Sequence, residues 1–275
     1  MIEIPEASTL ARQCAETLTG KTITSAVAAS SPHGFAWYAN DPGAYGDLLT
    51  GKTITGGAAH GGHPEIEAEE MRICVGEGVN IRFYEPGAQL PTRHQLKITF
   101  DDGSAICCTV SMYGFLGVFP DGMNDDYYYL VGKEKPSPLT DEFDEAYFQS
   151  MITDETLRLS GKAFLATEQR IPGLGNGVVQ DVLWEAKVHP KRKLNTLGED
   201  QLLDLYHQVK QVLTNMTHAG GRSTEKDLFG NPGGYEVILC RTTVGLPCSR
   251  CGTPIKRMAY LGGNVYVCEG CQPLT

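Results

Sequence analysis

The sequence lacks the long apolar run that a membrane-spanning helix requires. No stretch of its 275 residues comes near eighteen consecutive apolar residues, and nothing at the amino terminus resembles an export signal. No internal repeat or low-complexity tract occurs. A chain of this length can bury a substantial core, and two domains with a small additional module are typical of it. We therefore expect a cytoplasmic protein with no membrane partner.

Basic residues are scarce. The chain has 23 Lys and Arg against 33 Asp and Glu, a net charge of −10. Residues 1–154 carry 9 basic and 22 acidic side chains, or −13, while residues 155–275 carry 14 and 11, or +3. Nucleic-acid binders usually present a basic face, because neutralising phosphates supplies much of their affinity. Only the carboxyl-terminal half could provide such a face, which argues against tight DNA binding.

Four of the nine cysteines form two Cys-x-x-Cys pairs, sixteen residues apart, at Cys248, Cys251, Cys268 and Cys271. Two such turns facing each other make a closed tetrahedral site for a structural Zn²⁺, with no open position for chemistry. An iron site and two disulfides are the alternatives. Disulfides are disfavoured because the remaining cysteines show no framework pattern and a reduced cytoplasm suits them.

The amino-terminal half reads as one helix followed by short strands. Leu10, Cys14 and Leu18 lie on one stripe of a helix over residues 1–18, with Pro5 and Glu6 in its first turn. The Asp102-Gly103 pair between two strands is a hairpin signal. These features predict a β-sandwich or flattened barrel carrying the helix, with strands at 51–55, 71–75, 79–83, 95–100, 105–110 and 115–119.

The carboxyl-terminal half reads as helical. Residues 132–140 are polar with two prolines and predict a domain boundary. Thr196 and Glu199 have the spacing of a capping box at the start of the last helix. The predicted helices cover residues 141–151, 154–159, 161–168, 176–186 and 198–219, and the cysteine ribbon covers 237–272.

A glycine-rich turn separates two of these helices. Gly173, Gly175 and Gly177 flank Asn176, but the preceding segment is helical rather than a strand, so no nucleotide cofactor is expected. Such a turn still points backbone N–H groups toward an anion at the start of a helix. Asn176 would either cap that helix or contact a phosphate.

The order of these motifs resembles the formamidopyrimidine-DNA glycosylase and endonuclease VIII (Fpg/Nei) family. The motifs are the opening Met1-Ile-Glu-Ile-Pro-Glu6, the glycine turn, a Gly220-Gly221-Arg-Ser-Thr224 segment and the cysteine ribbon. The resemblance implies an α+β multidomain fold that binds double-stranded DNA, damaged or abasic, in a cleft. Its domains would be a β-sandwich with the amino-terminal helix (1–135), a helix–two-turns–helix domain (140–236) and a zinc ribbon (237–275).

The resemblance also implies a reaction. In the family an N-terminal amine attacks C1′ of a flipped-out nucleotide, a glutamate manages protons, and a Schiff base permits strand cleavage. Glu3 matches that glutamate and Glu6 its supporting carboxylate, although a first-turn helix glutamate is also common. The family's nucleophilic proline is replaced by Ile2. We expect Met1 to be retained, which moves the free amine outward by about 3.5 Å.

The DNA contacts that the family implies are partly retained. Lys162, Gly175 and Asn176 match its phosphate-binding residues. The intercalating loop corresponds to Met112 and Tyr113, without the family's arginines. No lysine occurs in the hairpin near His60 and His63, Glu85 occupies the expected void-filling loop, and Gly263 replaces the ribbon arginine.

Together these features predict a damaged-DNA-binding protein of the glycosylase and abasic-site lyase type with an atypical site. The alternatives are a catalytically silent nucleic-acid-binding protein and a protein-binding scaffold on the same fold.

Overall fold

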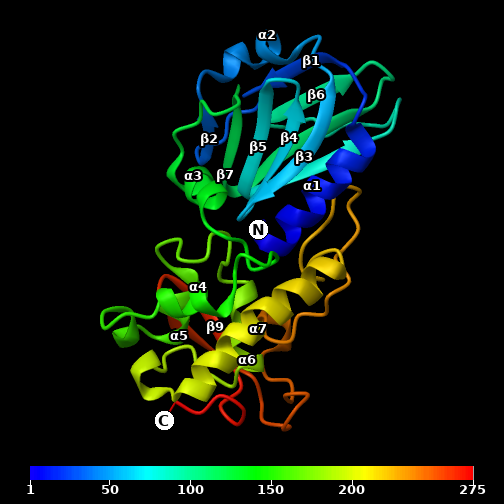
Figure 1. Cartoon of the computed structure of the whole chain (residues 1–275). Helices are drawn as coiled ribbons and strands as arrows, with labels where there is room; N and C mark the ends of the chain where they lie inside the picture. The colour runs from blue at the N-terminus through cyan, green and yellow to red at the C-terminus, as the bar shows by residue number, and fades with distance from the viewer. Residues whose placement is uncertain (275) are drawn as a thin grey trace.

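In the computed structural model a sheet domain lies above a helical part, and the amino terminus lies between the two (Figure 1). The structure describes residues 1–274. Helix α1 (Ile4–Leu18) runs beneath the sheet, with Pro5 and Glu6 in its first turn as expected. Its buried stripe includes Cys14, and burial raises the pKa of this thiol to about 12, so the thiol is a neutral core group.

Two long strands build the sandwich. β5 (Met71–Tyr84) pairs with β7 (Ala105–Pro120) from end to end, but the register slips where Gly78 of β5 lies opposite residues 111–113 of β7. A Cβ at Gly78 would lie 2.4 Å from the Tyr113 carbonyl oxygen, so only glycine fits this bulge. Bulges bend strands, and here both strands continue from one layer of the sandwich into the other.

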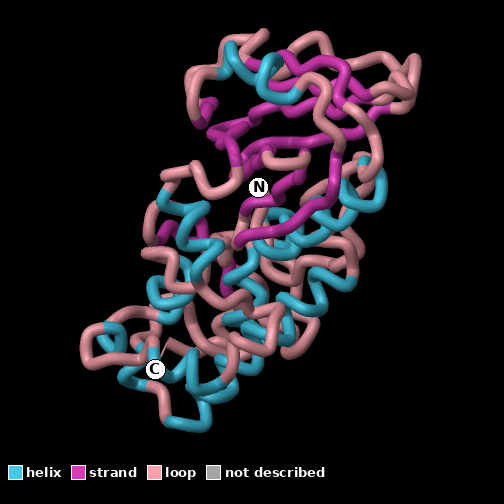
Figure 2. Tube along the Cα trace, turned by 45° about the horizontal axis from the view of Figure 1, so that its top comes forward, coloured by secondary structure: helices cyan, strands magenta, loops and turns pink. Residues whose placement is uncertain are grey.

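The remaining strands pair with one half or the other of this ladder. In one layer the order is β3-β4-β5-β7-β2, and in the other it is β1-β6-β7-β5. Figure 2 shows the strands confined to this part of the chain and to a small hairpin in the ribbon. The strands are β1 (Ile23–Ala28), β2 (Ala36–Ala39), β3 (Ile54–His60), β4 (His63–Ala68) and β6 (Leu96–Phe100); helix α2 (Tyr45–Leu49) follows β2.

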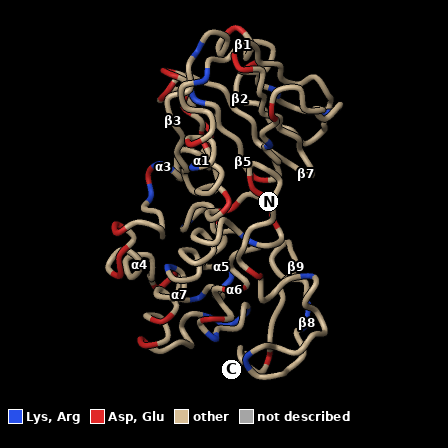
Figure 3. Tube along the Cα trace, turned by 90° about the vertical axis from the view of Figure 1, so that its right-hand side faces the viewer, with Lys and Arg blue, Asp and Glu red and all other residues tan. Residues whose placement is uncertain are grey.

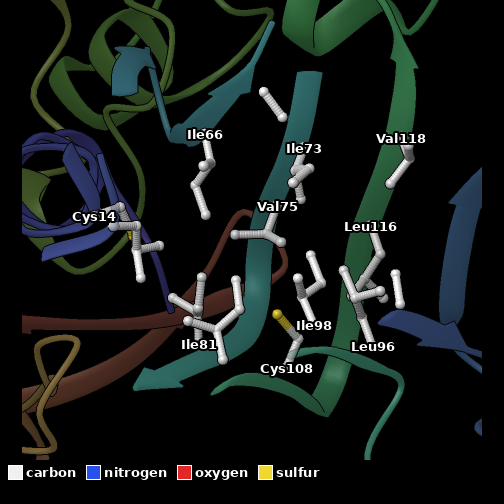
Figure 4. Packing of buried hydrophobic residues seen from close by; sticks show 14 of the residues in the cluster. Cys14, Ile66, Ile73, Val75, Ile81, Leu96, Ile98, Cys108, Leu116 and Val118 are labelled. Atoms are coloured by element: carbon white, nitrogen blue, oxygen red, sulfur yellow. The ribbon is translucent and has the colours of Figure 1, made fainter. Parts of the chain in front are cut away.

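The core of the sandwich fills the space between the layers and α1. Figure 4 shows Ile73, Val75, Leu116 and Val118 pointing from β5 and β7 into this space. Side chains from β4, β6 and α1 meet them there, among them Ile66, Leu96, Ile98 and Cys14. Burial of this apolar area is the main favourable term for the domain.

The helical part has a separate core of aromatic and aliphatic side chains, which Ile4 of α1 joins. It is built from α4 (Glu145–Ser150), α5 (Gly161–Ala166), α6 (Val178–Glu185) and α7 (Glu199–His218). A ribbon hairpin, β8 (Lys256–Tyr260) with β9 (Gly263–Val267), packs on Trp184 of α6 with the cysteines. Within residues 1–274, no helix is long and apolar enough to cross a membrane.

The α+β fold class predicted from the sequence is confirmed, with four local corrections. The predicted strands 71–75 and 79–83 are one bent strand, as are 105–110 and 115–119. The predicted boundary at 132–140 begins inside helix α3 (Tyr127–Glu134). Residues 154–159 form only a short 3₁₀ turn. Thr196 does not cap α7, because Gly198 is the N-cap and its N–H donates to Gln201 Oε1.

The close contact between α1 and β3 gives a test of the packing. A Cβ at Gly57 would lie 2.7 Å from the Ala11 carbonyl oxygen, a backbone atom that has no room to move. We expect Gly57→Ala to lower the free energy of unfolding by about 1–3 kcal/mol through overpacking. Gly34→Ala, at an open position, is the matched control. Equal unfolding free energies of the two variants in urea titrations would contradict this packing.

Candidate functional site at the amino terminus

Residues 1–4 are fixed between the two halves of the molecule. The Met1 α-amine forms an ion pair with the Glu225 carboxylate. The Ile2 N–H donates to the Glu77 carbonyl oxygen of β5 (2.7 Å), and the Ile4 N–H donates to the Gly173 carbonyl oxygen of the glycine turn (3.0 Å). The amino terminus is therefore held on one side by the sheet and on the other by the helical part.

Glu3 caps the start of α6 from a distant part of the chain. Its buried carboxylate accepts N–H bonds from Gly175 (3.1 Å), Gly177 (2.8 Å) and Val178 (2.9 Å). These are the unpaired donors at the positive end of a helix, which favour an ionised carboxylate. The expectation that this turn directs its amides toward an external anion is corrected, because an internal anion occupies them.

Arg222 compensates the buried negative charge. Its guanidinium donates to both Glu6 oxygens from Nε (3.0 Å) and Nη2 (2.7 Å), approaches Glu3 Oε1 at 3.4 Å and binds the Met1 carbonyl oxygen at 3.0 Å. Arg222 is only 3% exposed. Burial opposes its charge, but Glu3 and Glu6 outweigh that cost and raise the pKa of Arg222 above its ordinary value.

The glycines of the two motifs make room for this network. A Cβ at Gly177 would lie 1.6 Å from Arg222 Nη1, and one at Gly175 would lie 2.7 Å from Glu3 Cδ. Gly221 has a φ of +100°, a left-handed conformation that brings the Arg222 N–H within 3.0 Å of Glu6. Gly175 and Gly177 are thus needed for the close approach of Glu3 and Arg222.

Three cavities meet at Met1. The largest, about 640 Å³, lies under β2 and β7 and includes Trp37, Glu77 and Tyr113 in its lining. A second, about 190 Å³, is bordered by Met112 and Glu225. A third, about 180 Å³, lies between the sheet and the glycine turn beside Glu3 and Gly175. Met1, whose amine is paired with Glu225, thus lines all three cavities.

The expected DNA-contacting residues occupy different environments. Met112 and Tyr113 project from the β7 bulge and are exposed. Asn176 is also exposed, but it donates to the Asn264 carbonyl oxygen (3.1 Å) and does not cap α6. Lys162 is only 4% exposed and its Nζ donates to the Tyr260 carbonyl oxygen (2.8 Å). Burial lowers the pKa of Lys162, which therefore supports the ribbon hairpin instead of lying free on the surface.

The two histidines of the β3–β4 hairpin belong to a buried cluster. His60 lies 3.5 Å from the Glu65 carboxylate, which also accepts a bond from the Tyr129 hydroxyl (2.6 Å). His63 packs edge-on against Phe115 and Tyr129. Burial lowers the pKa of His63 and keeps the ring neutral.

The four cysteines of the ribbon lie together. Their sulfur atoms are all within 4.8 Å of one another, with 3.7 Å between Cys248 and Cys271 and 3.3 Å between Cys251 and Cys268. Four thiolates at about 2.3 Å from a central ion require sulfur separations of this size, and soft thiolate ligands suit Zn²⁺. The donor set and the spacing fit a structural zinc ion.

Sequence reasoning missed three residues at the amine: Glu225, Arg222 and Glu77. Arg222 and Glu225 lie in or beside the Gly220–Thr224 motif, whose glycines were the available signal. Glu77 has a φ of +58°, rare for a residue with a side chain, and a side chain that lines two of the cavities. The pairing of Gly76 and Gly78 around Glu77 was the only hint of this strained position.

Charge is distributed as the sequence implied. Figure 3 shows acidic positions throughout the sheet domain, including the region of the terminal amine. Lys and Arg positions are more frequent in the helical part and the ribbon. The net positive charge of residues 155–275 is therefore carried by the helical part and the ribbon.

Comparisons with known proteins agree with this architecture. Residues 135–227 match the family model described as the formamidopyrimidine-DNA glycosylase H2TH domain. The formamidopyrimidine-DNA glycosylase of Streptococcus pneumoniae serotype 4 is 31% identical over 199 residues, covering 69% of this chain and 70% of that protein. The Lactococcus lactis subsp. cremoris enzyme is 29% identical over 283 residues, with 99% of both chains covered.

Solved structures show the same likeness. The Lactococcus lactis Fpg in complex with abasic-site DNA has a TM-score of 0.84 at 26% identity, with 98% of this chain and 99% of that chain covered. A β-sandwich, an H2TH region and a four-cysteine ribbon around an amino terminus define the class of Fpg-fold proteins. This chain belongs to the Fpg/Nei family, as its motifs predicted.

Buried neutral His63 predicts a pH dependence of stability. Its folded-state pKa is below the unfolded value of about 6.5, so the unfolded chain takes up the proton first as the pH falls. The stability associated with His63 is complete above about pH 6.5 and is lost progressively below it. We expect His63→Phe to lose less unfolding free energy between pH 7 and pH 5 than the parent protein.

The exposed His207 supplies the control for this measurement. His207→Gln should keep the parental pH dependence in urea titrations. A parental slope in His63→Phe would show that His63 contributes nothing to the acid sensitivity.

Proposed function

We propose that the protein binds damaged or abasic double-stranded DNA between its two halves and acts there as a DNA glycosylase with abasic-site lyase activity. The observation that carries the proposal is the Met1 amine, which lies at the junction of three cavities and is held by Glu225. The relatives with the same fold are formamidopyrimidine-DNA glycosylases, and solved neighbours contain abasic or damaged DNA.

The proposed chemistry begins at the amine. An α-amine has a lower reference pKa than a lysine, so a larger neutral fraction is available near pH 7. We propose that Glu225 accepts the proton and that the neutral Met1 nitrogen attacks the sugar C1′. The C1′–base bond breaks as the N–C1′ bond forms. The lone pair of the bound nitrogen then opens the sugar ring: the C1′–O4′ bond breaks, O4′ takes up a proton and the resulting C1′=N group is a Schiff base. Loss of a C2′ proton from it drives the β-elimination that expels the 3′ phosphate.

Met1, Glu3 and Glu6 receive distinct roles in this proposal, and Ile2 a structural one. Glu3 carries negative charge beside the cavity at the glycine turn and favours positive charge developing at the sugar. Glu6 orients Arg222, which holds the Met1 carbonyl oxygen. Ile2 packs in the sandwich core and borders the two smaller cavities, whereas Met1 borders all three.

Several proposed DNA contacts surround this centre. Exposed Met112 and Tyr113 at the β7 bulge are placed to wedge into the base stack. Exposed Asn176, which faces the ribbon hairpin, is proposed to contact a phosphate, whereas the Gly175 N–H is occupied by Glu3. Lys162 is proposed to act through the hairpin that it holds. The three cores support the proposed domains 1–135, 140–236 and 237–275.

We further propose that Cys248, Cys251, Cys268 and Cys271 bind one structural Zn²⁺. The closed four-sulfur set leaves no position for a substrate, so the ion would stabilise the ribbon without taking part in the reaction.

Reductive trapping tests the proposed nucleophile. With sodium borohydride we expect a covalent adduct on abasic-site duplex, and peptide mass spectrometry should locate it at Met1. Glu225→Gln should slow adduct formation by about 100–10,000-fold, the range for a positioned acid–base group. Ile2→Gly permits removal of Met1 and moves the amine by one residue, so it should reduce trapping severely.

Glu236→Gln is a matched control for this series, since Glu236 lines none of the three cavities. The absence of any adduct from folded protein that still binds the duplex would replace the enzyme proposal by a silent DNA-binding protein.

Metal analysis tests the ribbon. We expect one zinc per chain in the purified protein and a lower melting temperature after chelation, because binding energy is coupled to folding in such sites. Cys248→Ser should abolish zinc retention, whereas Cys240→Ser should not, since Cys240 lies outside the cluster. Full thermal stability after complete zinc removal would refute the structural role.

A further inference from the structure

The largest cavity at Met1 has aromatic walls. Its lining includes Trp37 and Tyr38 of β2, Tyr113 and Phe115 of β7, and Tyr128 of α3. At about 640 Å³ it is within the usual size range of small-molecule sites. Aromatic faces at this spacing are suited to stacking on a flat heterocycle.

Two of these aromatic side chains are exposed to solvent, which is unfavourable for apolar surface in the free protein. Trp37 is 59% exposed and Tyr113 is 41% exposed, although both border a cavity in which they could be covered. Tyr113 is braced edge-on by Phe35, with ring centroids 6.2 Å apart. Large exposed aromatics beside a cavity indicate a binding surface.

The polar lining of this cavity is acidic. Glu77, Asp125 and Asp126 contribute carboxyl groups, and no Lys or Arg borders the cavity. Among the described residues that line it, the Met1 amine is the only cation, and it is paired with Glu225. Burial and the nearby Asp126 raise the pKa of Glu77.

An unpaired buried donor gives an independent indication of a ligand. Asn124 is 8% exposed and lines the cavity, yet its Nδ2 has no hydrogen-bond partner among residues 1–274. Leaving such a buried donor unpaired is unfavourable, because it has lost its hydrogen bonds to water. A ligand with an acceptor, such as a purine carbonyl oxygen, would satisfy it.

We propose that this cavity receives a flipped-out base carrying delocalised positive charge, with an N7-alkylated guanine as the representative class. The inference rests on the proposed function and specifies the substrate. The aromatic walls would bind the cationic ring by stacking and cation–π attraction, and the three carboxyl groups would balance its charge.

The contacts of Glu3 favour the same substrate class on geometric grounds. A neutral base generally needs a proton as it leaves, but both Glu3 oxygens already accept N–H bonds from the glycine turn and face Arg222, so Glu3 is poorly placed to deliver one. A cationic purine needs no proton. When C1′–N9 breaks, its electron pair returns to the ring and neutralises the charge, while the Met1 nitrogen bonds to C1′.

Tryptophan fluorescence tests the cavity without any enzymatic activity. The chain has two tryptophans, of which Trp184 is buried and Trp37 lines the cavity. We expect 7-methylguanosine to quench Trp37 at concentrations about tenfold lower than 7-methyl-7-deazaguanosine, its neutral isostere. Trp37→Phe should remove the quenching. Equal quenching by both nucleosides, or by neither, would overturn the proposal.

Charge variants refine the test. Asp126→Asn keeps the helix-capping group of α3 but removes a cavity charge, and it should reduce the preference for the cation severalfold. Asp47→Asn, on exposed α2, should leave the preference unchanged. An unaltered preference in Asp126→Asn would contradict the electrostatic basis.

A DNA experiment separates this inference from the proposed function. We expect the protein to release 7-methylguanine from a duplex and to do so faster than 8-oxoguanine. Adduct formation on abasic DNA without release of the alkylated base would overturn the inference and leave the proposed function intact. Absence of any adduct would refute the proposed function, whereas the nucleoside titration would still report on the cavity.

Discussion

The contact of Glu3 with the first turn of α6 is the interaction on which the arrangement of the molecule depends. It joins the start of the chain to the helical part through three backbone donors, and it places a carboxylate where the helix dipole favours one. Two buried carboxylates so close together need a compensating cation, which Arg222 supplies. Removing one partner of such a network typically costs about 3–5 kcal/mol, because the opposite charge stays buried.

The same network fixes the place of Met1 at the proposed reaction centre. Ile2 places its side chain in the sandwich core, while its N–H is bonded to β5. Met1 then has to leave the core, and its carbonyl and amine are held by Arg222 and Glu225. A proline at position 2 would offer no N–H for the bond to Glu77. The residues that hold the altered amino terminus, in which Ile2 replaces the family's proline, thus come from other parts of this chain.

The sequence predicted those features that depend on local pattern. The cysteine spacing, the α1 stripe and the Asp102-Gly103 hairpin each rest on short-range geometry and could be recognised. The bend of β5 and β7 could not, since it follows from a bulge in which Gly78 faces three residues of another strand. For the same reason the sequence could not show that Lys162 is buried, because a single lysine does not reveal the carbonyl that will bind it. The geometry of the site is determined by contacts between segments that are far apart in the sequence.

The uneven charge of the chain is consistent with one part supplying affinity for DNA phosphates and the other selecting the base. Phosphates attract basic residues, which are more frequent in the helical part and the ribbon, where Asn176 and Asn264 meet. The acidic sheet domain opposes general attraction to DNA, but it surrounds the cavity where charge can distinguish one base from another. A weak affinity for undamaged DNA is compatible with the proposed function if the flipped-out base gains stacking and a charge partner in the cavity. The low basic content therefore favours discrimination between bases over tight binding to all DNA.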